Sequence, residues 1–539
     1  MVDRISQLPI PILHHILCSL SQKEAVRTCL LSKQWRHLGS TRPKLDFSEV
    51  WFVNTQQTFV SVLDRTLQGY LDQDLFIHKL HLDLLRPEPV VSLLDKWIQI
   101  LALKIKVFKL IFLSYSAAYY ELPSAVFLAE SLEELHLCQC MVSSVESVRF
   151  KQMRTLTLER VLINDVTLEK IMLGCPLLGR MALFSCREIR NVRLVSEAAS
   201  CGLKHFELEN FDWIEGRSIE IDVPNLETVR IDGPWIWCHR QSAFLFSRLT
   251  SLDLRNVILS SESFDLLSFG CPTLESLTIY NCSGFEEFHL ASDSVKYLHI
   301  STRDIPIKGA TISAPNILKF LFCIRQVPDT FSFTTTTSKE WDSNIFLSSS
   351  REDDPDFDIN WWFLGLRRLL KPLSGSQIFL SLRMDGGPQD VPCSAFLSDE
   401  PPVVVRDLKF ETCDWCMPSW YMGFTNGLFR VCRPSHVLGS SLAMELVPSG
   451  FQLNILLANE GQVRTGPNFW GHDLEQVFVE TFDGQQWQII RPRELRNQKQ
   501  DGKIRLRLKW RCQDGGVAKP NYNIFSSFLS FLGFTTNSP

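Results

Sequence analysis

The sequence predicts an α/β protein in which a bundle of three short helices precedes a solenoid of strand–helix repeats. The solenoid is expected to form a curved parallel sheet with helices on its convex side. Two observations lead to this fold class. Apolar residues recur at helical spacing over residues 8–38, and the pattern L-x-x-L-x-L-x-x-C or a relative of it recurs from residue 132 onward. A content of 45% hydrophobic and 21% charged residues is typical of a globular chain.

Three helices are expected in the N-terminal segment. Pro9 and Pro11 mark the start of the first helix, since proline fits a first helical turn. Ser21, followed three residues later by Glu24, predicts the second start, and Ser32 is placed to cap the third helix. The apolar stripe of this segment is wider than so small a bundle needs, and the surplus predicts a partner surface.

The repeats have the length and pattern of leucine-rich repeats. Their Leu-x-Leu alternation makes a short strand with one buried face, and segments such as 164–173 and 261–269 predict helices between the strands. One unit cannot bury its apolar side by itself, so neighbouring units must share a core. Nine clear units start 21 to 25 residues apart. They begin at Leu132, Met153, Leu178, Leu203, Leu226, Leu249, Leu274, Val295 and Ile317.

Changes in pattern divide the chain into five predicted segments. They are the helical bundle at 1–45, the solenoid at 46–328, a polar and acidic loop or insertion at 329–358, an irregular continuation of the solenoid at 359–490, and a basic strand with a C-terminal tail at 491–539. The basic strand, KIRLRLKWR at 503–511, alternates charged and apolar residues. We favour an edge strand whose charges block further pairing; a phosphate-binding or nuclear-import patch is the alternative.

Residues 3–38 resemble the F-box of plant F-box proteins. The resemblance is carried by DRIS at 3–6, LP at 8–9, LSK at 31–33 and WR at 35–36. It implies docking on the Skp adaptor of a Skp–cullin–F-box ubiquitin ligase, and through that adaptor on cullin and a RING protein. Six basic and two acidic residues within positions 1–42 leave a net charge of +4, which suits an acidic partner. By position, the resemblance implies the following adaptor-binding residues: Leu8, Pro9, Ile12, Leu13, Ile16, Leu17, Leu20 and Trp35.

The likeness extends toward the C-terminus. GLF at 427–429, CRP at 432–434 and WGHDL at 470–474 are similar to the closing segments of plant F-box/LRR proteins. The resemblance therefore implies a substrate-recognition subunit whose solenoid binds a target protein for ubiquitination. Two alternatives remain open: a hormone-like small-molecule receptor that holds an inositol phosphate, and a scaffold that binds the Skp adaptor without directing ubiquitination.

Side chains between the repeat leucines are expected to lie on the concave face of the solenoid. They are polar, mixed in charge and more aromatic toward the C-terminal repeats. Such a face suits a protein partner and not a nucleic acid, because it lacks a basic stripe. Its cations are also interleaved with acids, which disfavours an inositol phosphate. The expected cofactor is therefore none, with an inositol phosphate as the alternative. The candidate substrate-binding residues are Arg230, Arg255, Tyr280, Tyr297 and His299.

The remaining composition excludes several classes of protein. A net charge of −5 gives no general attraction to nucleic acid or an anionic membrane. Sixteen scattered cysteines and no expected secretory signal indicate reduced thiols, hence the nucleus and/or cytoplasm. The chain carries no GxSxG, phosphate-loop or HExxH motif, and Cys413 with Cys416 form only a single CxxC pair. The sequence therefore predicts a non-catalytic adaptor with no catalytic and no metal-ligating residues.

Overall fold

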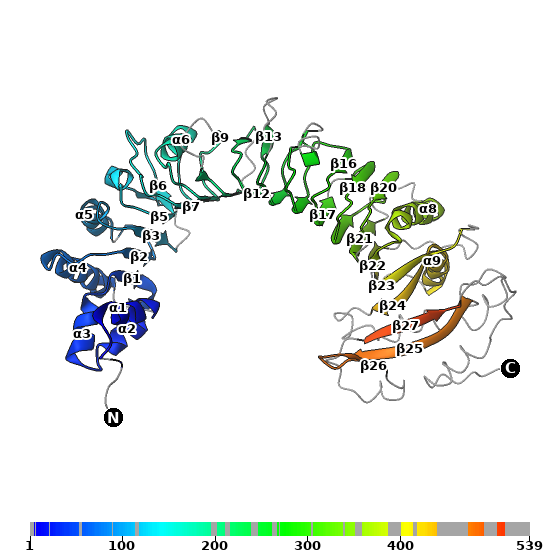
Figure 1. Ribbon diagram of the computed structural model, residues 1–539, viewed down its shortest axis with the longest axis horizontal. Helices are drawn as coiled ribbons and strands as arrows, with labels where there is room; N and C mark the ends of the chain where they lie inside the picture. The colour runs from blue at the N-terminus through cyan, green and yellow to red at the C-terminus, as the bar shows by residue number, and fades with distance from the viewer. Residues whose placement is uncertain are drawn as a thin grey trace. The chain divides into compact units, whose positions relative to one another are not determined.

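The computed structural model divides into two compact units, residues 1–274 and 275–539, which are described separately. Helices and strands carry the labels of Figure 1. The structure describes residues 5, 7–20, 22–52, 56–88, 90–113, 118–195, 202–210, 216–238, 246–260, 263, 267–268, 270–302, 306–337, 340–350, 358–385, 400–412, 418–438, 473–489 and 504–511.

The first unit begins with the predicted bundle: α1 (Ile10–Ser19), α2 (Gln22–Thr28) and α3 (Lys33–Ser40). Pro9 stands directly before α1, as expected for a residue that fits a helix start. The Ser32 hydroxyl accepts a hydrogen bond from the backbone N–H of Trp35 at 3.2 Å, so the predicted cap of α3 is confirmed. Ser21 lies outside the described residues. The bundle therefore forms where the helical periodicity and the capping residues predict it.

A long parallel sheet follows the bundle in the first unit. Its strands pair in the order β1–β2–β3–β5–β7–β8–β10–β12–β14. Alternate side chains, such as Leu80 and Leu82 on β2, are buried, which is the expected result of Leu-x-Leu alternation. The strands are β1 (Lys44–Ser48), β2 (Lys79–Leu84), β3 (Val107–Phe112), β5 (Glu134–Cys138), β7 (Thr155–Glu159), β8 (Arg180–Phe184), β10 (His205–Glu209), β12 (Thr228–Asp232) and β14 (Ser251–Arg255).

The second layer of this unit is only partly helical. Figure 1 shows the helices α4 (Gln56–Asp72), α5 (Val91–Leu101) and α6 (Asp165–Leu173) packed behind the early strands. Beyond α6, short strands replace helices and form a separate parallel sheet of β9 (Asn191–Val195), β11 (Ser218–Asp222) and β13 (Ile236–Cys238). On β11, buried Ile219 and Ile221 alternate with polar residues, a period that fits a strand and excludes an amphipathic helix. The prediction of helices is therefore wrong for the units that carry β9, β11 and β13. Of the predicted helix at 261–269, the described residues Ser263, Leu267 and Ser268 are helical, and the others lie outside the described part of the chain.

In several repeats the first residue after the strand has a positive φ. The first residue after β12 is Gly233, with φ of 130°, and a Cβ there would lie 2.1 Å from the carbonyl oxygen of Asn210. A shared turn after the strands keeps successive units in the same orientation. The corresponding non-glycine residues, all with φ between 50° and 60°, are Gln139, Arg160, Ser185 and Asn256.

The second unit continues the same architecture. Its parallel strands pair in the order β15–β17–β19–β21–β22–β23–β24. Its second layer contains β16 (Glu287–Ala291), β18 (Gly309–Ser313), β20 (Thr330–Thr334), α8 (Ile359–Leu370) and α9 (Pro418–Val431). The strands of the long sheet are β15 (Ser276–Tyr280), β17 (Tyr297–Thr302), β19 (Lys319–Ile324), β21 (Asp342–Ser350), β22 (Gln377–Asp385), β23 (Val403–Thr412) and β24 (Cys432–Leu438).

The loop predicted at 329–358 is wrong over most of its length. Strand β20 lies within it, and β21 is an interior strand that pairs with both β19 and β22. The serines and threonines hide an alternation in which Ile345 and Leu347 are buried, a pattern that is typical of a strand despite its polar composition. The solenoid therefore continues through this segment, and residues 351–357 lie outside the described part of the chain.

The predicted boundary at 490/491 and the predicted edge strand are also wrong. Strand β27 (Ile504–Trp510) lies between β24 and β25 (Leu474–Phe482) and is antiparallel to both. Strand β26 (Trp487–Ile489) pairs with β25. The chain thus closes the sheet by inserting a late strand between two earlier ones. The CRP and HDL motifs meet here, because the Arg433 guanidinium donates to the Asp473 carboxylate.

Candidate binding surfaces

The bundle has a small core that uses three of the predicted adaptor-binding residues. Leu13 and Leu17 are fully buried, Trp35 is 5% exposed, and all three pack with Ala25 and Leu38. The prediction that Leu13, Leu17 and Trp35 contact a partner directly is therefore wrong. Three helices must bury one apolar side of each against the others, and those positions look like surface anchors in the sequence.

Other apolar residues of the bundle lie on its surface. Of the predicted adaptor-binding residues, Leu8, Pro9 and Ile12 are exposed, whereas Ile16 and Leu20 are partly buried. Leu30 and Leu31, in the turn between α2 and α3, are 83% and 70% exposed. Apolar side chains gathered at this density on so small a surface mark an interaction site. The exposed residues that the sequence interpretation did not include are Ile5, Ile10, Val26, Leu30 and Leu31. Each is an apolar residue that is not part of the bundle core, and that pattern could have indicated its exposure.

The bundle is tied to the first repeat through Arg42, which is almost fully buried. Its guanidinium donates to the carbonyl of Leu17 at 3.3 Å, and its own carbonyl accepts from the Tyr70 hydroxyl of α4 at 2.7 Å. The Lys44 ammonium of β1 donates to the carbonyl of Cys18 at 3.2 Å. Burial lowers the pKa of Arg42 and raises the pKa of the Tyr70 hydroxyl. These contacts fix the end of α1 on the sheet.

The first open face consists of the side chains of β1–β14 that point away from the core. Its cations face acids on neighbouring strands: Lys109 lies 2.8 Å from Glu134, and Arg180 pairs with Glu207. The predicted substrate-binding residue Arg255 contacts Asp253 at 2.9 Å, and Arg230, also predicted, lies 4.0 Å from the same residue. Lys109, Arg180, Arg230 and Arg255 therefore each lie within ion-pair distance of an acid. Three residues predicted to lie on this face are buried: Cys138, Ala182 and Asp232.

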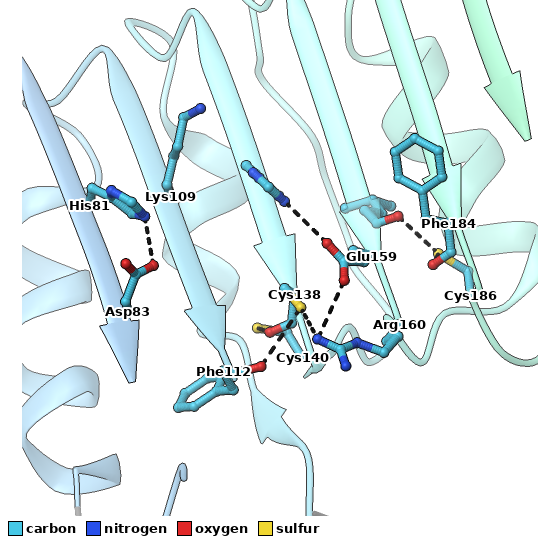
Figure 2. Close-up of polar contacts among 12 residues, drawn as sticks. His81, Asp83, Lys109, Phe112, Cys138, Cys140, Glu159, Arg160, Phe184 and Cys186 are labelled. Carbon is cyan, nitrogen blue, oxygen red and sulfur yellow. Dashed lines mark hydrogen bonds and ion pairs between the residues drawn. The ribbon is translucent and has the colours of Figure 1, made fainter. Parts of the chain in front are cut away.

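Figure 2 shows why Cys138 is covered. The Arg160 guanidinium, from the turn after β7, lies 2.9 Å from the Cys138 sulfur and 3.3 Å from the Glu159 carboxylate. The imidazole of His136, with Nε2 3.9 Å from the Glu159 carboxylate, lowers the pKa of Glu159, whereas burial raises the pKa of Cys138. Burial also raises the pKa of Cys186 to about 12. Such thiols stay protonated and behave as small apolar side chains.

No group of three or more His, Cys, Asp or Glu side chains within the described residues is placed to hold a metal ion. Cys413 and Cys416 lie outside them. No helix of the described residues has the length and apolar character needed to cross a membrane.

The second open face consists of the corresponding side chains of β15–β24. The three predicted aromatic residues share it: the rings of Tyr280 and His299 meet edge-to-face with centroids 6.2 Å apart, and Tyr297 is 47% exposed. The sequence interpretation missed Phe346 and Phe379, whose rings lie 5.8 Å apart on β21 and β22. In the sequence, each of these phenylalanines stands between two buried aliphatic residues of its strand, and that alternation could have predicted its place on the open face. Ser301 and Cys323, predicted on this face, are buried.

The basic residues of β27 are not a free patch. Glu480 of β25, with a side chain only 5% exposed, contacts Arg505 at 2.8 Å and Arg507 at 3.1 Å. Lys509 lies 2.9 Å from Glu475 on the same strand. The basic residues Arg505, Arg507 and Lys509 therefore pair with acids of β25. The strand is not an edge strand, and these side chains do not form a phosphate site.

Two family models match this architecture. The F-box domain matches residues 5–46, and the LRR repeats of FBD-associated F-box protein At5g56370 match residues 94–242 and 221–332. The fold and these matches define a protein with an F-box followed by leucine-rich repeats. The chain belongs to the F-box/LRR-repeat proteins.

Curated relatives come from Arabidopsis thaliana. F-box/LRR-repeat protein 13 is 30% identical over 254 residues, which are 46% of this chain and 54% of that protein. F-box/LRR-repeat protein At5g02910 is 29% identical over 256 residues, 47% and 52% of the two chains. The putative F-box/FBD/LRR-repeat protein At1g66300 is 28% identical over 320 residues, 57% and 67% of the two chains. The similarity thus spans about half the length of the first two relatives.

Proposed function

We propose that this protein is the substrate-recognition subunit of a Skp–cullin–F-box E3 ubiquitin ligase. Its F-box docks on the Skp adaptor, which brings cullin and the RING protein, and its open faces bind a target protein. The observation that carries the proposal is the exposed apolar surface of a bundle that matches the F-box domain. The protein itself performs no chemistry and acts in the nucleus and/or cytoplasm.

The docking surface consists of the exposed apolar residues of the bundle. Leu8, Pro9 and Ile12 at the start of α1 and Leu30 and Leu31 after α2 are available to a partner. Burying them would release their apolar area from water, at roughly 25 cal/mol per Å². The net positive charge of the bundle favours an acidic partner and a fast encounter. Leu13, Leu17 and Trp35 support this surface from within the core.

An adaptor of this kind acts through geometry. It raises the effective concentration of a target near an enzyme that the chain does not contain. That effect requires a fixed connection between the docking surface and the repeats. The buried Arg42, bonded to Leu17 and Tyr70, supplies such a connection within the first unit.

The receptor alternative has less support. An inositol phosphate needs converging cations, whereas Arg180, Arg230 and Arg255 on the first open face each contact an acid. We therefore propose no cofactor. The scaffold alternative differs only in the absence of cullin, so co-purification with cullin separates it from the ligase.

The first test is binding of the purified Skp adaptor. The variants Leu8→Ala/Ile12→Ala and Leu30→Ser/Leu31→Ser should each weaken binding roughly tenfold or more, with unchanged thermal unfolding, because they remove exposed contacts. The measurement is an isothermal titration with the full chain. Val166→Ser/Leu173→Ser on α6, where both residues are exposed, is the matched control and should bind normally. A folded wild type that does not bind the adaptor contradicts the proposal.

A further inference from the structure

We propose that the second open face recognises an extended, acidic segment of the target protein. Its carboxylate would be received by Lys319 and Tyr297, and a neighbouring apolar side chain by Leu321, Phe346 and Phe379. This inference rests on the proposed function only in taking the bound segment to belong to a target; the site itself needs no adaptor.

The apolar part of the site spans three neighbouring strands. Leu321 on β19 is in register with Asn344 on β21, which is in register with Phe379 on β22. Phe346 contacts Phe379. Leu321, Phe346 and Phe379 each remain partly exposed on the open face instead of entering the core. Aromatic side chains at the centre of a polar face are typical of protein-binding surfaces.

The charged part of the site is the ammonium group of Lys319, which can bind an anion of the partner. Lys319 is exposed and forms no ion pair within the described part of the chain. Its neighbour on β17 is Tyr297, and its neighbour on β21 is Asp342. The Asp342 carboxylate is directed to Arg406, at 3.4 Å. An ammonium beside an exposed phenol hydroxyl is therefore free to bind an incoming anion.

The next acid along the sheet is likewise engaged. Asp407 on β23 contacts Arg406 at 2.7 Å and His436 of β24 at 3.2 Å. Asp342 and Asp407 are thus paired with other side chains. Within the described residues, neither acid forms an ion pair with Lys319. Charge complementarity then favours an acidic partner over a basic one.

The dimensions and donors define the ligand class. From β17 to β22 the site crosses three strand spacings, about 14 Å, which is roughly the length of four extended residues. Phosphate groups are usually held by clusters of arginine that bind in a bidentate manner. One lysine and one phenol match the smaller charge of a carboxylate. The fitting partner is therefore an aspartate or glutamate flanked by apolar residues in an extended segment.

The test uses the full-length chain in complex with its Skp adaptor and pooled synthetic peptides. One pool places Asp or Glu between Leu, Ile and Phe; matched pools replace the acid with Gln, Lys or phosphoserine. We expect the wild type to bind the acidic pool roughly tenfold more tightly than the Gln pool. Lys319→Gln should remove that preference, and Phe379→Ala should weaken binding to every pool.

Charge reversal provides the sharpest variant. Lys319→Glu should shift the preference from the acidic pool to the Lys pool, and the exposed position makes misfolding an improbable cause of such a shift. Lys308→Gln is the matched control. Lys308 is an exposed lysine directly before β18, away from the open face, and it pairs with Glu286. The control variant should leave all preferences unchanged.

Three results would overturn the inference. The first is a wild type that does not distinguish the acidic pool from the Gln pool. The second is a Lys319→Glu variant with the preference of the wild type. The third is a stronger preference for the phosphoserine pool, which would assign the site to a phosphopeptide. Adaptor binding measured on the same samples separates these failures from failure of the proposed function, since intact adaptor binding without peptide selectivity rejects this inference only.

Discussion

The two open faces are built from the same alternation of buried and exposed residues, yet they present different surfaces. On the first, cations and acids on adjacent strands pair, as in Lys109 with Glu134 and Arg180 with Glu207. On the second, Lys319 is exposed and forms no ion pair within the described residues, and it shares the face with Tyr297 and Phe379. The repeat backbone therefore determines where the face lies, and the residues between the leucines determine what it binds.

The ion pairs of the described residues are of two kinds, partly exposed and buried. Those of the first open face are partly exposed, and each is expected to contribute at most about 1 kcal/mol. At the C-terminal end of the second unit, Glu480 is buried between Arg505 and Arg507. The ion pairs of the first face lie at the surface, whereas the buried carboxylate of Glu480 connects β25 to β27.

The largest expected effect follows from this difference. Glu480→Ala should lower the free energy of opening of β25 and β27 by about 3 kcal/mol, because it removes a buried carboxylate from Arg505, whose side chain is 18% exposed, and from the more exposed Arg507. Hydrogen exchange of the peptides covering β25 and β27 measures that free energy. Glu475→Ala on the same strand removes the exposed partner of Lys509 and should cost less than about 1 kcal/mol. Equal protection in the two variants would show that burial does not distinguish these pairs.

An intermediate effect concerns pH at the start of the first open face. His81 lies 3.1 Å from Asp46 and 2.8 Å from Asp83. The hydrogen bond with Asp46 raises the pKa of His81 above 6.5 and lowers the pKa of Asp46 below 3.8. The histidine's contribution is complete below its unfolded pKa and is lost as the pH rises through its folded pKa. The aspartate's contribution is lost only as the pH falls through its own lowered pKa.

Stability of β1 and β2 should therefore be highest between those limits and fall toward alkaline pH. His81→Gln should cost about 1.5 kcal/mol near pH 5.5 and less near pH 8, since it removes a hydrogen bond to a charged group. Hydrogen exchange of β1 and β2 across this range measures the difference. The control is His205→Gln on the same face, where the ring contacts the Thr228 hydroxyl at 2.9 Å. A pH slope in β1 and β2 that survives in His81→Gln would assign it to another group.

Periodicity predicted the elements better than it predicted their surfaces. The repeat leucines and the cap of α3 were recognisable because their signals are local. Ile12 and Leu13 are adjacent apolar residues on one helix, yet one is 48% exposed and the other is buried; only the packing of three helices distinguishes them. The place of β27 depends on pairing with Glu480, distant in sequence. Non-local contacts of this kind leave no periodic signal in a single sequence.

The smallest expected effect tests whether charge by itself makes a binding face. Asp253→Asn releases Arg230 and Arg255 from their shared acid and should change stability by less than about 1 kcal/mol, because all three side chains are partly exposed. It creates available cations on the first open face, where the residues in register with Arg230 are Glu207 and Asp253 and not aromatic residues. In a Lys319→Gln background, Asp253→Asn should therefore give only weak, salt-sensitive binding of the acidic peptide pool. If the double variant recovered full affinity, charge would be sufficient, and the apolar residues that distinguish the second open face would have no role in recognition.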